Sequence, residues 1–244
     1  MDFIDYKNKI SLKKYDLRFE QTFVKHYLLY TLFTLFDFKN KTILDCPCST
    51  GYITNLLIQK GASFVVCSDI VNEQLEYALE RFKINNIDEK SYKLIQHDAK
   101  EIKLLYKEVQ MALVLHLFCF GKTKDELINI AKFIYINLEH NGKLISFHCT
   151  PLHLQSEKIY ENYYNSKIIE YSTKNKKEGA KLITKDNDFL LPRYVYSNEY
   201  IKDILNEAGF KNIKIHKLKC NPLYTGNENH HIICDYSLIE ANKV

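Results

Sequence analysis

Short apolar runs alternate with amphipathic stretches along most of the chain. Continuous apolar runs are typical of parallel strands covered on both faces, whereas apolar residues spaced three to four apart are typical of helices. We expect strands at residues 43–44 with their flanks, 64–67, 92–96, 109–115 and 143–148. We expect helices at residues 52–60, 73–82, 123–138 and 199–208. Strands that alternate with helices predict an α/β fold.

The two ends of the chain extend this pattern. Residues 19–36 carry apolar side chains at helical spacing, which predicts one or two helices ahead of the first strand. A sixth strand is expected after Gly209, and residues 231–240 supply the last strand. The fold expected is a Rossmann-like, seven-stranded, mostly parallel sheet with helices on both faces and an antiparallel last strand. Residues 149–191 are irregular, so we expect an insertion there.

The loop after the first strand carries the clearest chemical signal. It reads Asp45-Cys46-Pro47-Cys48-Ser49-Thr50-Gly51, and a second acid, Asp69, ends the next strand. A βαβ unit places a ligand at the carboxyl ends of its strands, with a terminal acid on a ribose. Dinucleotide sites use three glycines, and this loop has one, so a pyrophosphate ligand is disfavoured. Two acids around a compact loop suit S-adenosylmethionine.

The motifs resemble those of a known family. Residues 45–51 resemble motif I of class I S-adenosylmethionine-dependent methyltransferases, roughly Asp-Leu-(Gly/Ala/Pro)-Cys-Gly-x-Gly. The family's later landmarks follow in order: Asp69, then His97-Asp98-Ala99, then the stretch 137–145, then Glu207-Ala-Gly-Phe210. Within the family the chain is most similar to small-molecule methyltransferases of the toxoflavin-synthase type. The likeness runs from about residue 15 to residue 210 and is diffuse outside the motifs.

The resemblance implies which residues bind the cofactor. Asp69 accepts the ribose hydroxyls and Asp98 bonds the adenine amino group, although each acid is also a reasonable helix N-cap. The cofactor is S-adenosyl-L-methionine and the product S-adenosyl-L-homocysteine. The cofactor-binding residues expected are Asp45, Pro47, Ser49, Gly51, Asp69, Ile70, Asp98, Ala99 and Leu115.

The resemblance also implies a methyl acceptor, a small aromatic or heterocyclic metabolite methylated on nitrogen or oxygen. His116 follows the fourth strand and is the candidate for orienting or deprotonating the acceptor. A buried structural histidine is the alternative. The candidate substrate residues are Tyr15, Arg18, His116, Arg193, Tyr194 and Tyr196. An exposed helix face for the first two, and ordinary strand packing for the tyrosines, are the alternatives.

Two other functions stay open. Pro47 and Ser49 stand where the family usually has glycine or alanine, and Gln110 replaces an acid, so a non-catalytic protein that binds a nucleoside or a protein is one alternative. The second is an RNA or protein methyltransferase, which the net charge of +4 suggests. The lysines are spread evenly and form no basic stripe, so no nucleic-acid partner is expected.

The chain is expected to form a single methyltransferase domain. Its parts are an N-terminal helical lid (1–40), a cofactor-binding core (41–148), a substrate-wall insertion (149–196) and a C-terminal helix with strands (197–244). No signal-peptide pattern and no apolar run of about 18 residues occurs, which predicts a cytoplasmic protein without a membrane partner. The seven cysteines suggest neither disulfides nor a metal site, and residues 221–224 predict a turn.

Overall fold

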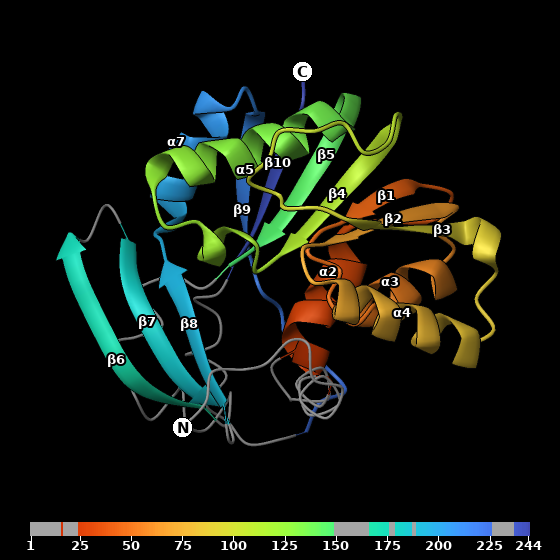
Figure 1. Ribbon diagram of the computed structural model, residues 1–244, viewed down its shortest axis with the longest axis horizontal. Coiled ribbons are helices and arrows are strands. Elements are labelled where there is room, and N and C mark those ends of the chain that lie inside the picture. The colour runs from red at the N-terminus through yellow and green to blue at the C-terminus, as the bar shows by residue number, and fades with distance from the viewer. Residues whose placement is uncertain (1–15, 17–23, 149–165, 176–178, 187–188, 226–236) are drawn as a thin grey trace.

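A seven-stranded sheet forms the centre of the protein (Figure 1). The computed structural model describes residues 16, 24–148, 166–175, 179–186, 189–225 and 237–244. The strand order is β3-β2-β1-β4-β5-β10-β9. The strands are β1 (Thr42–Asp45), β2 (Phe64–Asp69), β3 (Tyr92–Gln96), β4 (Val109–Leu115), β5 (Leu138–Phe147), β9 (Lys211–Lys217) and β10 (Ser237–Asn242).

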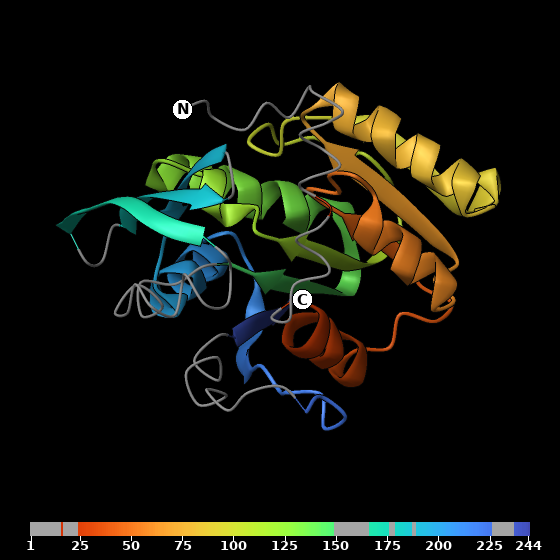
Figure 2. The same ribbon diagram turned by 90° about the horizontal axis from the view of Figure 1, so that it is seen from below.

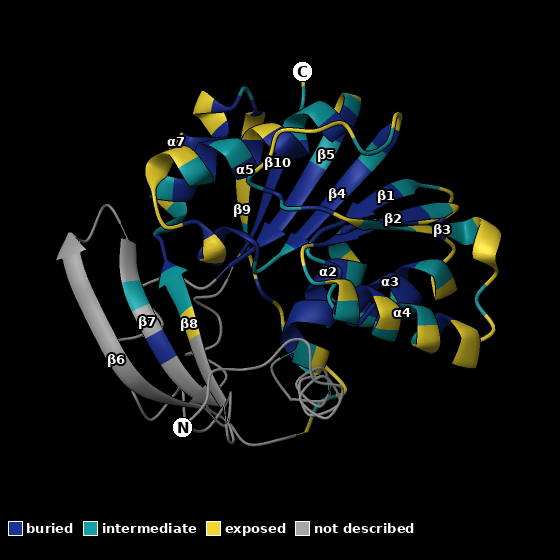
Figure 3. Ribbon diagram, in the orientation of Figure 1, coloured by how far each residue is buried: buried dark blue, intermediate teal, exposed yellow. Residues whose placement is uncertain are grey.

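Helices cover both faces of this sheet (Figures 1 and 2). One face carries η2 (Val24–Leu29), α2 (Tyr30–Leu35), α3 (Tyr52–Gln59) and α4 (Asn72–Ile84). The other carries α5 (Lys124–Asn137) and α7 (Asn198–Glu207), and the short turns are η3 (Glu89–Ser91) and η4 (Phe118–Phe120). The central strands are buried almost throughout (Figure 3), because apolar side chains leave the sheet on both sides.

The predicted fold is confirmed. Strands β1 to β5 run parallel, and β10 lies antiparallel between β5 and β9. The helix starts follow from local capping: Thr123 accepts a hydrogen bond from the Glu126 amide, and Ser197 accepts one from the Tyr200 amide. Strand β5 begins five residues earlier than predicted, and the described last strand begins at Ser237.

The described part of the segment between β5 and α7, where the sequence pattern is irregular, forms regular strands. Strands β6 (Ser166–Asn175), β7 (Gly179–Asp186) and β8 (Phe189–Val195) form a separate antiparallel sheet beside the main one (Figure 1). The register between β6 and β7 shifts at Ile168/Glu170 and again at Thr173/Asn175. Each bulge inserts a residue and breaks the alternation by two that identifies a strand in a sequence.

Among the described residues, the helices are all too short or too polar to cross a membrane. Gln110, which stands where the family has an acid, has a structural role in the sheet. Its side-chain oxygen accepts a hydrogen bond of 3.1 Å from the Thr42 amide at the start of β1. Residues 221–224 form the predicted turn, in which Asn221 accepts hydrogen bonds from the amides of Leu223 and Tyr224.

Candidate functional site

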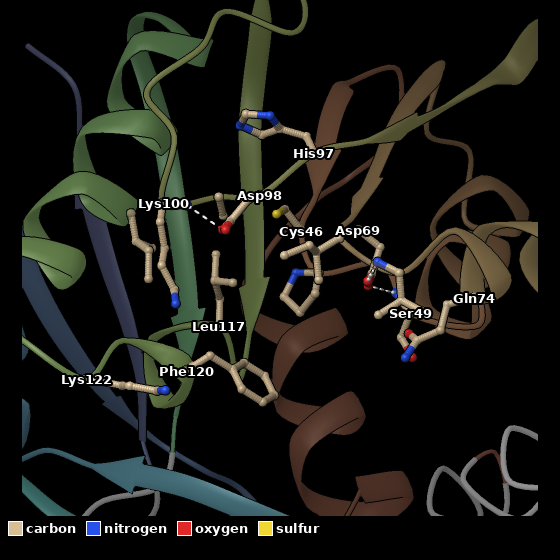
Figure 4. Close-up of a pocket in the computed structure, with 15 residues that line it drawn as sticks. Cys46, Ser49, Asp69, Gln74, His97, Asp98, Lys100, Leu117, Phe120 and Lys122 are labelled. Carbon is tan, nitrogen blue, oxygen red and sulfur yellow. Dashed lines mark hydrogen bonds between the residues drawn. The ribbon is translucent and has the colours of Figure 1, made fainter. Parts of the chain in front are cut away.

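A cavity of about 360 Å³ lies at the carboxyl edge of the parallel strands (Figure 4). Its size lies within the range of small-molecule sites. The loop after β1, the ends of β2 and β3, and the segment after β4 supply its walls. Of the predicted cofactor residues, Pro47, Ser49, Asp69, Ile70, Asp98 and Ala99 line it.

Asp69 is held in a fixed orientation at the end of β2. Its Oδ2 accepts a hydrogen bond of 2.9 Å from the Ser49 amide, and its Oδ1 accepts one of 3.0 Å from the Val71 amide. Burial raises the pKa of this carboxyl, and these amides oppose the rise. Helix α4 has Val71 at its N-cap and no side-chain cap, so Asp69 is not the N-cap. Both oxygens keep lone pairs for a ligand hydroxyl.

Asp98 lies at the start of a turn after β3. Its Oδ1 accepts a hydrogen bond of 2.9 Å from the Lys100 amide (Figure 4). The preceding His97 is buried; its Nε2 lies 2.9 Å from the Glu101 carbonyl oxygen, and its ring packs on Phe133. Asp98 lines the cavity, and its hydrogen bond with the Lys100 amide helps to fix its side chain. Asp69 and Asp98 are thus presented to one cavity from the ends of adjacent strands.

The other predicted cofactor residues, Asp45, Gly51 and Leu115, do not line the cavity. Asp45 is buried at the end of β1, where Thr54 donates a hydrogen bond of 2.6 Å to it, and burial raises its pKa to about 7. Gly51 has φ 72°, and a Cβ added there would lie 2.8 Å from the Cβ of Ala78. Both residues thus contact the neighbouring helices, Asp45 through Thr54 on α3 and Gly51 through Ala78 on α4, and do not face the cavity.

The predicted acceptor residues are dispersed. His116 follows β4 with φ 64°, and its ring lies edge-on to Phe147 at 4.7 Å. Arg193 and Tyr194 are half-buried on β8. Tyr196 is buried, and its hydroxyl donates a hydrogen bond of 2.6 Å to the Gly121 carbonyl, which makes it a core residue here. Tyr15 and Arg18 lie outside the described residues.

Four polar or aromatic residues of the cavity lie outside the motifs singled out from the sequence: Gln74, Lys100, Phe120 and Lys122. Gln74 lies in the first turn of α4 and is 4% exposed, an unusual burial for glutamine. Phe120 belongs to η4 and is 42% exposed. No local pattern marks either residue, because burial at the cavity depends on how α4 and η4 pack against the sheet. Within the described ranges, no cluster of His, Cys, Asp and Glu could hold a metal.

The core of the chain matches a protein family. Residues 43–142 match the family described as "Methyltransferase domain". That range contains the loop after β1 and both cavity acids, Asp69 and Asp98. Over this range the chain is similar to methyltransferase domains. The two carboxylates of the cavity and the single glycine of the loop after β1 fit S-adenosylmethionine better than a dinucleotide.

Solved structures share the fold of this chain at low sequence identity. A structure from Listeria monocytogenes, titled as an S-adenosylmethionine-dependent methyltransferase, superposes with a TM-score of 0.65 at 16% identity, covering 89% of this chain and 96% of that one. The pyocyanin biosynthetic protein superposes with a TM-score of 0.66 at 13% identity, covering 100% of this chain and 62% of that one.

A curated relative is a ribosomal RNA small subunit methyltransferase A from Mesomycoplasma hyopneumoniae. It is 35% identical over 71 residues, which is 28% of this chain and 27% of the relative. The match thus spans about a quarter of the length of the curated relatives.

Proposed function

We propose that the protein transfers the methyl group of S-adenosylmethionine to a nitrogen or oxygen atom of a small aromatic or heterocyclic metabolite, leaving S-adenosylhomocysteine. The observation that carries this proposal is the placement of Asp69 and Asp98 at the ends of adjacent strands, facing one cavity. That arrangement matches an adenosine, which presents ribose hydroxyls at one end and an exocyclic amine at the other.

Each residue then has a definable task. Asp69 accepts hydrogen bonds from the ribose hydroxyls, and Asp98 accepts one from the adenine amine. Ile70 is 56% exposed at the cavity, so a flat ring can cover it and remove apolar surface from water. When bound, the cofactor supplies an electrophilic methyl group. The protein's main work is to exclude water and align the acceptor atom, so a strong base is not required.

An aromatic residue at the cavity favours a small planar methyl acceptor. Phe120 presents a partly exposed ring at the cavity, and aromatic rings stack with planar ligands in offset geometry. The fold similarity to the pyocyanin biosynthetic protein is consistent with this class, as is the resemblance to enzymes of the toxoflavin-synthase type. We assign His116 as the group that orients the acceptor or takes its proton, and residues 149–196 as the acceptor wall. Arg193 and Tyr194 lie on that wall.

RNA methylation is the second candidate, because the curated relatives act on ribosomal RNA by name. It predicts binding to RNA that weakens steeply with salt. The small-molecule proposal predicts no such binding. A filter-binding assay at two salt concentrations with a structured RNA therefore separates the two.

The first test is isothermal titration of the protein with S-adenosylmethionine and with S-adenosylhomocysteine. We expect micromolar binding of both ligands, lost or weakened at least about tenfold in Asp69→Ala, since a charge-assisted hydrogen bond contributes about 1.5–3 kcal/mol. Asp203→Ala, the same change at an exposed position on α7, is the control and should bind as the wild type does. If the wild type binds neither ligand, the proposed function is wrong.

A further inference from the structure

Asp16, Thr50 and Arg81 form a closed ring of polar contacts beside the cofactor loop. The Thr50 hydroxyl donates a hydrogen bond of 2.5 Å to Asp16 Oδ1, and Arg81 forms an ion pair with Asp16 Oδ2. Arg81 Nε donates a hydrogen bond of 2.9 Å to the Thr50 carbonyl oxygen. Each of the three residues thus contacts the other two, and the ring joins residue 16, the loop after β1 and helix α4.

The ring is well shielded from water. Thr50 is fully buried, and the side chains of Arg81 and Asp16 are only 17% and 16% exposed. The centres of the aromatic rings of Tyr52 and Tyr77 lie 5.4 and 5.8 Å from the Arg81 guanidinium, and Tyr77 also hydrogen-bonds to Asp16. Ion pairs that are shielded in this way are screened less than surface pairs, and truncating one partner leaves a buried charge. The ring therefore resists movement of Thr50.

The residue next to this ring has an unfavourable backbone conformation. Ser49 has φ 49°, in the left-handed region that disfavours residues with a Cβ. Asparagine or aspartate can offset this cost with a local side-chain hydrogen bond. The buried Ser49 hydroxyl finds no hydrogen-bond partner in the described part of the chain. The conformation is therefore maintained by what holds the neighbouring residues.

The conformation of Ser49 matters for the site because its amide donates to Asp69. That hydrogen bond of 2.9 Å forms only while the Ser49 N–H points at the end of β2. Thr50, the following residue, is fixed through both its hydroxyl and its carbonyl group. A shift of Thr50 would rotate the preceding peptide units and misalign the acid that faces the cavity.

We propose that the Asp16–Thr50–Arg81 ring compensates for the serine at position 49, by holding the left-handed backbone that glycine adopts freely, and so positions Asp69 for the cofactor. Arg81 and Asp16 are positioning residues, which act through Thr50 and Ser49. This inference rests on the proposed function, because the quantity that the ring controls is affinity for the cofactor.

The decisive test compares Arg81→Gln in two backgrounds, with and without Ser49→Gly, by titration with S-adenosylhomocysteine. We expect Arg81→Gln alone to raise the Kd about tenfold, comparable to the preference against the left-handed region. Adding Ser49→Gly should return the Kd to within about threefold of the wild-type value, because glycine needs no external support at positive φ. A general packing role for Arg81 would not be rescued by a change at position 49.

Lys143→Gln is the matched control for loss of an ion pair. Lys143 lies on strand β5, pairs with Glu240 at 2.6 Å and lies over the Phe36 ring. Like Arg81, it combines an ion pair with an aromatic contact, but it is not part of the ring beside the loop. The Kd of Lys143→Gln for S-adenosylhomocysteine should stay within about twofold of the wild-type value. Circular dichroism establishes that each variant is folded at the temperature of titration. Thr50→Val, which removes only the hydroxyl, replaces Arg81→Gln if the latter does not fold.

Hydrogen exchange of the ligand-free proteins provides the second measurement. In Arg81→Gln, a peptide containing Ser49 should exchange faster than in wild type, because its bond to Asp69 opens more often. A loss of affinity that is equal with and without Ser49→Gly overturns the inference, and so does unchanged loop exchange. If the wild type binds neither ligand, the proposed function fails, and the exchange measurement still decides whether the ring holds the loop.

Discussion

The backbone amide of Ser49 donates a hydrogen bond of 2.9 Å to Oδ2 of Asp69, across 20 positions of sequence. This contact joins the two features on which the proposed cofactor site depends, the loop after β1 and the acid at the end of β2. It exists because β1 and β2 are parallel neighbours, with Asp45 in register with Cys67. The acid is therefore oriented by the loop before a ligand arrives, which lowers the entropic cost of binding.

Asp45 should make the affinity for S-adenosylmethionine depend on pH. Burial raises the pKa of Asp45 to about 7, so the carboxyl is largely protonated in mildly acidic solution. A cation in the adjoining cavity favours the ionised form. Binding should therefore strengthen between about pH 6 and about pH 8, by at most about tenfold per pH unit.

Isothermal titration across this pH range measures the effect. S-adenosylhomocysteine, which lacks the sulfonium charge, should show a shallower dependence. Asp45→Asn removes the titrating group and should flatten the profile. An equal slope in that variant would assign the pH dependence to another group.

His148 should make the protein less stable in mild acid. Burial lowers its pKa to about 4, opposed by the Tyr196 backbone, and neither ring nitrogen has a well-formed hydrogen bond within the described ranges. Between about pH 6.5 and about pH 4 the unfolded chain binds a proton that the folded chain does not. The free energy of unfolding should therefore decrease as the pH falls through this window, by up to about 3 kcal/mol.

Urea unfolding at several pH values measures this loss. In His148→Leu the slope between about pH 6.5 and about pH 4 should be smaller than in wild type. His140→Gln, an exposed histidine at the β5 start, is the control and should keep the wild-type slope. Identical slopes in all three proteins would show that His148 does not titrate in this way.

Gly51→Ala should destabilise the protein more than Gly61→Ala. Both glycines have positive φ, so each alanine costs about 1–2 kcal/mol in backbone strain. At Gly51 the new Cβ also meets Ala78 and Phe82 at 2.8 Å, which adds about 1–3 kcal/mol of overpacking. At Gly61 the nearest atom is Cγ of the Lys39 side chain, at 3.3 Å. Urea unfolding of the two variants gives the difference, and equal losses would contradict the overpacking argument.

Tyr196→Phe should affect stability and not cofactor binding. The Tyr196 hydroxyl donates a buried hydrogen bond to the Gly121 carbonyl, and its loss leaves that acceptor unsatisfied. We expect the free energy of unfolding to fall by about 1–3 kcal/mol. The Kd for S-adenosylhomocysteine should change less than about twofold. A large change in Kd with unchanged stability would indicate that Tyr196 takes part in ligand binding.

The order of strands and helices was predictable because it depends on local periodicity. The continuous apolar run at residues 64–67 and the caps at Thr123 and Ser197 mark their elements without reference to the rest of the chain. The acids Asp69 and Asp98 were predictable for a related reason. Each follows a parallel strand, and the carboxyl ends of such strands meet at one edge.

The sheet β6–β8 could not be predicted in the same way. Its bulges displace the alternation of apolar and polar residues, so that the segment has no recognisable period. The roles of Gly51 and Tyr196 were also beyond local patterns. Gly51 was expected near the ligand and instead packs on α4, and Tyr196 was a candidate acceptor contact and instead lies in the core.

The sequence by itself determined the α/β order, the sheet with its antiparallel last strand, and the two acids that line the cavity, because each depends on residues close together in the chain. Only the tertiary structure decided which residues support those acids. Asp16 and Arg81 are 65 positions apart, and Gln74 reaches the cavity only through the packing of α4. Such contacts depend on how whole elements pack, and local periodicity carries no information about that packing.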